Sequence, residues 1–289
     1  MPEGLTSVGN WTFESCTSLN VVTLPDSLTI IGDVAFGGCS SLTAITLPVG
    51  LTSIGEGAFA LCSRLNGITF PDGLTSIGEG AFFGCSKLTD IVIPESVTKI
   101  KLNPFIDCDN LTRIETMPEN TEYTSIDGVL FDKQLETLLA YPTARPNNTY
   151  ELPEGVLYIH YWAFYNCTNL LEVTLPDSLI SIGDRAFGGC NSLTAITIPD
   201  GLTSIGNDAF YGCHSLTAVI LPNSLTSIGD RAFARCIYLS VITLPDSIKS
   251  IGKDAFEGYN QVLLSVTKGS YAEQYAKENG IAYMYTLGI

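Results

Sequence analysis

Nine cysteines are the most reactive side chains of this 289-residue chain, and their spacing limits the chemistry open to them. Within each of two groups they follow one another at intervals of 23 residues. An odd number at a fixed interval indicates a repeated structural position and not a disulfide pairing scheme. A file of thiols could be oxidised or bind zinc, but a tetrahedral zinc site needs about four ligands that converge on one point. We therefore expect no metal, and buried free thiols acting as small apolar groups, at Cys16, Cys39, Cys62, Cys85, Cys108, Cys167, Cys190, Cys213 and Cys236.

Carboxylates and threonines form two further files with the same spacing. An acidic residue usually follows the proline of each repeat, and stacked carboxylates could recruit calcium. A threonine file on a flat sheet could match a polysaccharide lattice. Asp beside Pro is also typical of turns and Thr of strands, so we interpret both files as structural. They comprise Asp26, Asp72, Glu95, Asp177, Asp200 and Asp246, and Thr23, Thr46, Thr69, Thr174, Thr197 and Thr243.

Four charged residues interrupt a position that small residues occupy elsewhere. Asp90, Arg113 and Glu172 share one phase of the repeat, and Glu115 lies two residues after Arg113. We expect all four at the centre of the inner sheet face, where repeat proteins offer extended binding surfaces. The alternative is that these charges are solvated and compensate for a perturbed repeat.

Aromatic side chains crowd one repeat, at Tyr158, His160, Tyr161, Trp162 and Tyr165. Tyr161 and Trp162 could stack on a sugar or anchor a partner, because aromatic rings offer large apolar faces with a polar edge. The alternative is that the cluster packs against the inserted segment described below.

These positions are held by a repeat whose unit reads L-x-x-I-x-L-P-x-x-L-x-x-I-G-x-x-A-F-x-x-C. One such unit is too small to bury its apolar residues alone, so the units must stack as the coils of a solenoid, like residue on like residue. The alternation in Ile45-Thr46-Leu47 predicts a short strand that pairs in parallel with its neighbours. The segment from Gly to Cys, with an acidic residue at its start, predicts a short helical or 3-10 turn on the outside.

The repeat unit resembles the treponemal-type leucine-rich repeat of BspA-like surface proteins over nearly the whole chain outside one insertion. The resemblance implies a curved, right-handed solenoid with a parallel sheet on its concave face. It also implies exposure on a cell surface or secretion, and adhesion or binding to a host protein. The family carries no catalytic motif, so the resemblance assigns no site residue.

Two segments depart from the repeat. Apolar runs at 129–131 and 135–141 around a polar turn predict a β-hairpin, which we interpret as a spacer or, alternatively, a binding tongue. Near the C-terminus, Tyr259 occupies the cysteine position; Ser270 and Glu273 then form a capping box, and Gly280 fits a helix stop. A helix from about Tyr271 to Asn279 and a strand over 282–285 are expected to cap the last coil. The predicted organisation is a repeat block at 1–117, a hairpin insertion at 118–152, a second block at 153–262 and a cap at 263–289.

The composition and the absence of known motifs argue against several classes of function. A formal net charge of −16 repels nucleic-acid phosphates and anionic lipids, and no apolar run is long enough for a membrane span. Residues 1–11 have neither the basic segment nor the apolar core of a secretory signal. The chain also lacks a nucleophile triad, a phosphate-binding glycine loop and an HExxH motif. We therefore expect a non-catalytic, cofactor-free surface adhesin that binds a protein, such as one of the host extracellular matrix. The alternatives are a carbohydrate-binding module and an architectural spacer.

Overall fold

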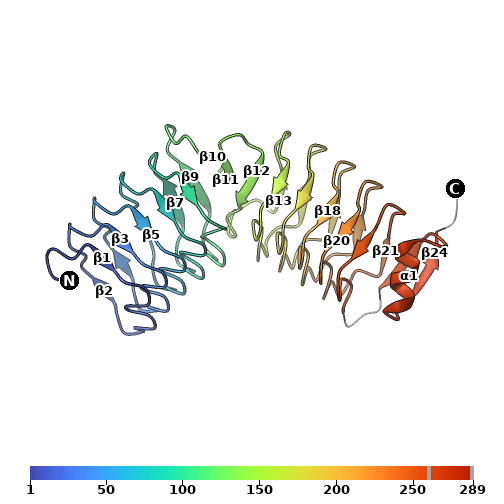
Figure 1. Ribbon diagram of the computed structural model, residues 1–289, viewed down its shortest axis with the longest axis horizontal. Coiled ribbons are helices and arrows are strands. Elements are labelled where there is room, and N and C mark those ends of the chain that lie inside the picture. The colour runs from blue at the N-terminus through green and yellow to red at the C-terminus, as the bar shows by residue number, and fades with distance from the viewer. Residues whose placement is uncertain (259–261, 287–289) are drawn as a thin grey trace. The chain divides into compact units, whose positions relative to one another are not determined.

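The structure is a computed structural model that describes residues 1–258 and 262–286, so the predicted role of Tyr259 lies outside the described residues. The chain forms two compact units, Met1–Pro146 and Asn147–Ile289. Within each unit, successive coils of about 23 residues lie side by side (Figure 1). The repeat solenoid that the sequence predicts is confirmed. The boundary between the units falls within the predicted insertion, and the division at 117, 152 and 262 stays a prediction.

In unit 1 the coils contribute to two rows of strands, except that the coil at 66–70 has no strand in the I-x-L row, whereas only one row was expected. The expected row follows the I-x-L segments and consists of β2 (Val21–Val22), β4 (Ala44–Ile45), β7 (Asp90–Ile93) and β9 (Arg113–Thr116). The additional row is a parallel sheet of β1 (Ser7–Val8), β3 (Ile30–Ile31), β5 (Ser53–Ile54), β6 (Ser76–Ile77) and β8 (Lys99–Ile100). Most strands of this row begin with a serine, whose side chain is small enough for close stacking. The Oγ atoms of Ser53 and Ser76 lie 2.9 Å apart in a hydrogen bond.

Unit 2 repeats both rows in parallel register, with partners 23 residues apart. The I-x-L row contains β13 (Thr149–Glu151), β15 (Glu172–Thr174), β17 (Ala195–Thr197), β19 (Ala218–Ile220) and β21 (Val241–Thr243). The second row contains β14 (Tyr158–Ile159), β16 (Ser181–Ile182), β18 (Ser204–Ile205), β20 (Ser227–Ile228) and β22 (Ser250–Ile251). In both rows the inward residue is buried and the outward residue is at least partly exposed, because strand side chains alternate between faces.

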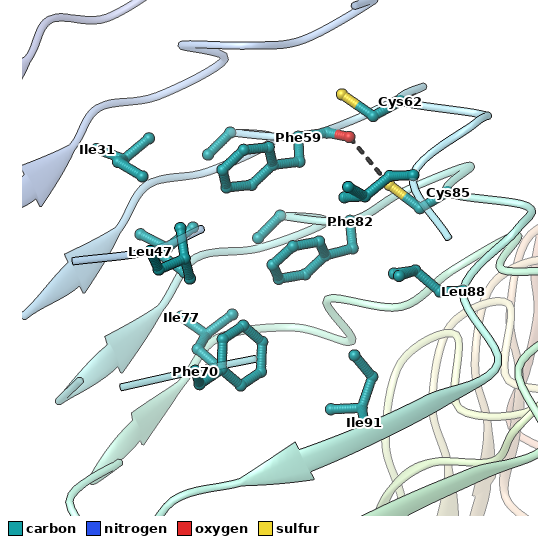
Figure 2. Packing of buried hydrophobic residues seen from close by; sticks show 14 of the residues in the cluster. Ile31, Leu47, Phe59, Cys62, Phe70, Ile77, Phe82, Cys85, Leu88 and Ile91 are labelled. Atoms are coloured by element: carbon teal, nitrogen blue, oxygen red, sulfur yellow. Dashed lines mark hydrogen bonds between the residues drawn. The ribbon is translucent and has the colours of Figure 1, made fainter. Parts of the chain in front are cut away.

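The core consists of columns in which the same or a similar apolar side chain recurs from coil to coil. Phe59 and Phe82 are fully buried, and their rings stack at 5.5 Å with an interplanar angle of 7° (Figure 2). Leucine and isoleucine columns line the same interior. Burial of apolar surface is non-directional, so the backbone ladders fix the register and the columns follow from it.

The segments between Gly and Cys are turns, so the expectation of short helical or 3-10 segments was wrong. Alternate amides bond backward within the coil, as from Gly37 to Val34, while the amides between them bond to the next coil, as from Phe36 to Ala58 at 2.7 Å. Val34 has a left-handed φ of 53°, which a right-handed helix does not allow. The acidic residue predicted as a helix cap instead bonds across coils, since Asp33 Oδ1 accepts from the Glu56 amide at 2.8 Å.

The cysteine column is buried except for Cys16, and all nine thiols are free. The buried thiols also donate hydrogen bonds, a role that was not predicted from the sequence. Cys85 Sγ lies 3.1 Å from the Phe59 carbonyl oxygen of the preceding coil and donates to it (Figure 2). Burial raises the pKa of Cys62 to about 12, so this thiol remains protonated and unreactive at neutral pH.

Thiol labelling is therefore expected to modify one cysteine per folded chain and nine per unfolded chain. A chromogenic disulfide reagent at pH 8 gives both numbers. The reason is that reaction requires an accessible thiolate, and only Cys16 is exposed. Cys16→Ser should abolish the fast reaction. More than one fast-reacting thiol in the folded chain would show that the column opens readily.

The insertion forms three antiparallel strands and not only the expected hairpin. β10 (Tyr123–Ile126) pairs with β11 (Val129–Asp132), which pairs with β12 (Thr137–Ala140). The Tyr123 hydroxyl accepts from the Ile100 amide at 2.7 Å, so a side chain covers the last amide of the β8 ladder. The insertion thereby covers part of this sheet edge with a side chain.

At the C-terminal end, α1 (Tyr271–Glu278) and β24 (Tyr283–Tyr285) follow β23 (Leu263–Val266), and β24 pairs with β23. Ser270 caps α1, its Oγ accepting from the Glu273 amide at 3.2 Å. Tyr275 packs its ring edge against Phe256 at 6.3 Å and so ends the phenylalanine column. Among the described residues no helix has the length and apolar character needed to cross a bilayer.

Acid is expected to weaken this end of unit 2 through Glu273. Lys277, the Gly269 amide and the Tyr285 hydroxyl lower the pKa of Glu273 from 4.5 to about 2. The stabilisation by the carboxylate is thus fully present above pH 4.5 and is lost as the pH falls towards 2. The melting temperature of Glu273→Gln should lie below that of the wild type at pH 7, and the gap should narrow towards pH 2. Glu278→Gln on the same helix is the control and should show no such trend; a constant gap for Glu273→Gln would contradict the assignment.

Candidate functional site

Asp90, Arg113 and Glu115 lie together on the exposed face of β7 and β9. The strands pair in parallel, with Asp90 beside Arg113 and Val92 beside Glu115. Arg113 Nε lies 2.6 Å from Asp90 Oδ1, and the two side chains are 61% and 45% exposed. An ion pair this exposed contributes about 0–1 kcal/mol to stability, so core packing does not require it.

Glu115 is tied to the insertion. Its Oε2 accepts from the Ser125 hydroxyl at 3.0 Å, and Ser125 Oγ accepts from the Thr116 amide at 3.2 Å. The turn of the hairpin reaches β9 as well, since the Gly128 carbonyl accepts from the Ile114 amide at 2.8 Å. The insertion therefore fixes one carboxylate of the charged group.

Glycine is required at position 128. Its φ is +77°, and a Cβ there would lie 2.7 Å from the Cβ of Arg113. The contacts of Gly128 with Arg113 and of Ser125 with Glu115 were not predicted from the sequence. Residues outside the insertion can be placed by their phase in the repeat, but the insertion has no such phase. The Asp-Gly pair at 127–128, a common hairpin turn, was the available signal.

A hollow of about 680 Å³ adjoins Asp90 on the same face. It is centred on the coil at 66–70, which forms no strand in the I-x-L row. Thr46, Gly67 and Thr69 line it, and a Cβ at Gly67 would meet no atom within 4 Å. Asp90 thus lies at the rim of a depression that is lined by small and hydroxyl side chains and by the exposed Val49.

Glu172 belongs to unit 2 and is described with that unit's sheet. It is exposed on β15, beside Thr149 of β13 and Ala195 of β17. A hollow of about 560 Å³ runs along this face, lined by Glu172, Thr174 and Thr197 among others. The structure therefore brings three of the four predicted charged residues together and describes the fourth separately.

Of the two predicted aromatic site residues, Tyr161 is exposed and meets His160 edge-on at 5.2 Å. Trp162 is half-buried, with its ring tilted on Tyr165 at 5.4 Å and covered by the Arg185 guanidinium at 5.0 Å. Burial lowers the pKa of His160, which stays neutral near pH 7. Within residues 1–258 and 262–286, no group of three or more His, Cys, Asp or Glu side chains could hold a metal ion.

The profile of the BspA type leucine-rich repeat region matches the chain in six copies, over residues 1–134 and 143–262. The chain belongs to the BspA-type leucine-rich repeat family. None of the curated proteins matches it.

Solved structures of other leucine-rich repeat proteins share this fold. A leucine-rich cell surface protein of Faecalibacterium prausnitzii is 29% identical, with a TM-score of 0.70 over 99% of this chain and 75% of that one. A leucine-rich repeat protein of Eubacterium ventriosum is 27% identical, with a TM-score of 0.65 over 93% and 82%. The pneumococcal vaccine antigen PcpA, at 22% identity and a TM-score of 0.67 over 98% and 78%, shows the fold alone. This BspA-type chain is thus similar to leucine-rich repeat proteins of a bacterial surface type, a class of interaction modules.

Proposed function

We propose that this chain is a non-catalytic adhesin module, displayed on a bacterial cell surface or secreted, which binds a protein of a host or a neighbouring cell. Its contact face is the exposed side of β7 and β9 with the adjoining hollow. The observation that carries the proposal is the Asp90–Arg113 pair, an exposed charge pair with little value for stability, beside Glu115 held by Ser125. The description of the Faecalibacterium relative as a cell surface protein supports the location.

The partner is expected to present a basic surface. The chain carries 30 acidic and 14 basic residues, and its field attracts positive patches and repels acidic ones. Charges at the rim of an interface mainly raise the association rate, so binding should weaken as salt increases. Glu172 on β15 is proposed as a contact on the exposed sheet face of unit 2, considered separately from the β7–β9 face.

The test is a binding panel of purified extracellular matrix and cell-surface proteins, with affinity measured by biolayer interferometry. A variant with Ala at Asp90, Arg113, Glu115 and Glu172 should stay folded by circular dichroism and lose at least about tenfold in affinity, or 1.4 kcal/mol. A matched variant with Ala at the exposed Glu3, Lys87, Glu119 and Glu154 changes the net charge equally and should bind like the wild type.

Three outcomes contradict the proposal. The wild type binds no protein of the panel, or both quadruple variants bind as the wild type does. An equal loss in both variants would point to net charge alone and would also remove the β7–β9 face as the contact.

A further inference from the structure

Two columns on the turn side differ in composition between unit 2 and unit 1. The first column is uncharged in unit 1 and alternates in charge along unit 2, whereas the second, three residues later, places a glycine between two tyrosines. In unit 1 the first column reads Trp11, Val34, Gly57, Gly80 and Asn103. In unit 2 the first column reads Trp162, Arg185, Asp208, Arg231 and Asp254, and the second reads Tyr165, Gly188, Tyr211, Ala234 and Glu257.

Asp208 holds two arginines of the neighbouring coils. Its Oδ2 lies 2.8 Å from Arg231 Nη2 and 3.3 Å from Arg185 Nε. The side chain of Asp208 is nine-tenths buried, whereas the arginines are 40% and 45% exposed. The carboxylate thus lies beneath two guanidinium groups that face outward.

Aromatic rings fix the same arginines from the side. The Arg185 guanidinium covers Trp162 at 5.0 Å, and Arg231 and Arg235 lie over the Tyr211 ring at 5.5 and 5.4 Å. A guanidinium held by both a carboxylate and a ring loses little further freedom when it binds a ligand, which favours affinity.

Between these side chains is a hollow of about 220 Å³, lined by Tyr165, Arg185, Gly188, Asp208, Tyr211 and Arg231. The hollow depends on Gly188, because a Cβ there would lie 3.1 Å from the Tyr165 ring. The missing side chain at 188 leaves a notch between the tyrosines of the coils on either side.

Stability does not account for this arrangement. Asp208 Oδ1 is buried and has no hydrogen-bond partner among the described residues, which is unfavourable for the fold. Val34 or Gly57 at the same phase in unit 1 avoids that cost. Such local departures from the rules of stability are expected at functional sites.

From this geometry we propose that the notch binds a sugar acid, a uronic or sialic acid residue of a glycan. Arg185 and Arg231 each use one nitrogen on Asp208, and in the described part of the chain their other guanidinium nitrogens have no hydrogen bond. Those N–H groups suit a carboxylate, which accepts two parallel hydrogen bonds from a guanidinium. The tyrosine walls suit a sugar ring, and the small volume suits one ring.

An acidic peptide fits less well. The backbone amides around the notch already bond between coils, as from Arg185 to Asn207 and from Asp208 to Asp230, both at 2.8 Å. A peptide could therefore gain no main-chain hydrogen bonds from these amides. The sequence-based sugar hypothesis named Tyr161 and Trp162; here Trp162 supports Arg185, and neither ring lines the notch.

The test compares matched sugars by isothermal titration and by change in the NMR signals of the sugar. Glucuronate and N-acetylneuraminate should bind at least tenfold more tightly than glucose, which has a hydroxymethyl group where glucuronate has the carboxylate. Gly188→Ala narrows the notch beside the Tyr165 ring without changing a charge, and Arg185→Lys keeps the charge but loses the fork. Both should abolish the preference for the acid. Arg113→Ala, in unit 1, should leave it unchanged.

The proposal is overturned if the wild type binds glucuronate no better than glucose, or if Gly188→Ala and Arg185→Lys bind it as well as the wild type. It is also overturned if poly-glutamate or inorganic phosphate competes as well as the sugar acids, since the notch would then be a general anion site. None of these results bears on the β7–β9 face, so the two proposals stand or fall separately.

Discussion

Phe82→Ala is expected to destabilise unit 1 by about 3–5 kcal/mol, the usual cost of removing a fully buried aromatic ring. The Phe82 ring is stacked on Phe59 at 5.5 Å and on Phe105 at 5.8 Å, and it meets Phe70 at 5.6 Å. Alanine would leave a cavity bordered by three rings. The backbone ladders hold the neighbouring coils at fixed spacing, so the cavity cannot collapse. Urea unfolding followed by circular dichroism should show a lower midpoint for this variant.

Phe83→Ala is the matched control. Phe83 is the next residue in the chain, but its side chain lies on the turn side and is only half-buried. Its removal is expected to cost about 1 kcal/mol or less, as for most surface substitutions. Equal effects of the two variants, or a loss below about 1.5 kcal/mol for Phe82→Ala, would show that the aromatic column does not govern the stability of unit 1.

The contrast between these adjacent phenylalanines was predictable from the sequence, because phase in a repeat gives burial directly. A phenylalanine recurs at the phase of Phe82 in every coil, usually after an alanine, whereas Phe83 stands where other coils have Gly37 or Ala60. The same reasoning predicted the I-x-L strands, the buried thiols and the stacking of like residues. All of these predictions depend on the 23-residue period, which can be recognised in the linear sequence.

The turns and the second strand row were not predictable in the same way. The segment with Ala35 and Phe36 has apolar spacing compatible with a helix, and local propensity alone favours that interpretation. Its amides are instead satisfied by the next coil, as in the bond from Phe36 to Ala58. Such bonds form between residues 22 or more positions apart, and no local pattern contains them.

In the candidate sites, too, contacts set by the repeat phase were predictable and contacts made by the insertion were not. The phase places Asp90 beside Arg113, whereas the hold of Ser125 on Glu115 comes from an insertion that has no phase. The column that contains Arg185, Asp208 and Arg231 was readable, since the three residues are 23 apart. Comparing only strand positions among coils overlooked it. The binding roles of all these residues stay predictions.

Asn120→Ala is the second large effect that we expect, a loss of about 3–5 kcal/mol. Asn120 is 1% exposed and uses its whole amide. Nδ2 donates to the carbonyls of Pro94 at 2.7 Å and Val97 at 3.1 Å, and Oδ1 accepts from the amides of Glu122 at 3.0 Å and Tyr123 at 2.7 Å. Alanine would leave four backbone groups without these partners, each worth about 1–3 kcal/mol when buried and unsatisfied, with some regained through water. Thermal and urea unfolding measure the loss.

The control is Asn110→Ala. Asn110 is exposed and donates one hydrogen bond, to the Ser86 carbonyl, so its removal should cost less than about 1 kcal/mol. Asn120→Asp separates packing from hydrogen bonding, because it keeps the shape and the acceptor but sets a carboxylate against two carbonyl oxygens. It should therefore be at least as destabilising as alanine at pH 7; a near-neutral Asn120→Asp would mean that the amide donors contribute little. Because Asn120 fixes the start of β10, amide exchange at Ser125 should also speed up in Asn120→Ala, and the support of Glu115 at the β7–β9 face would weaken with it.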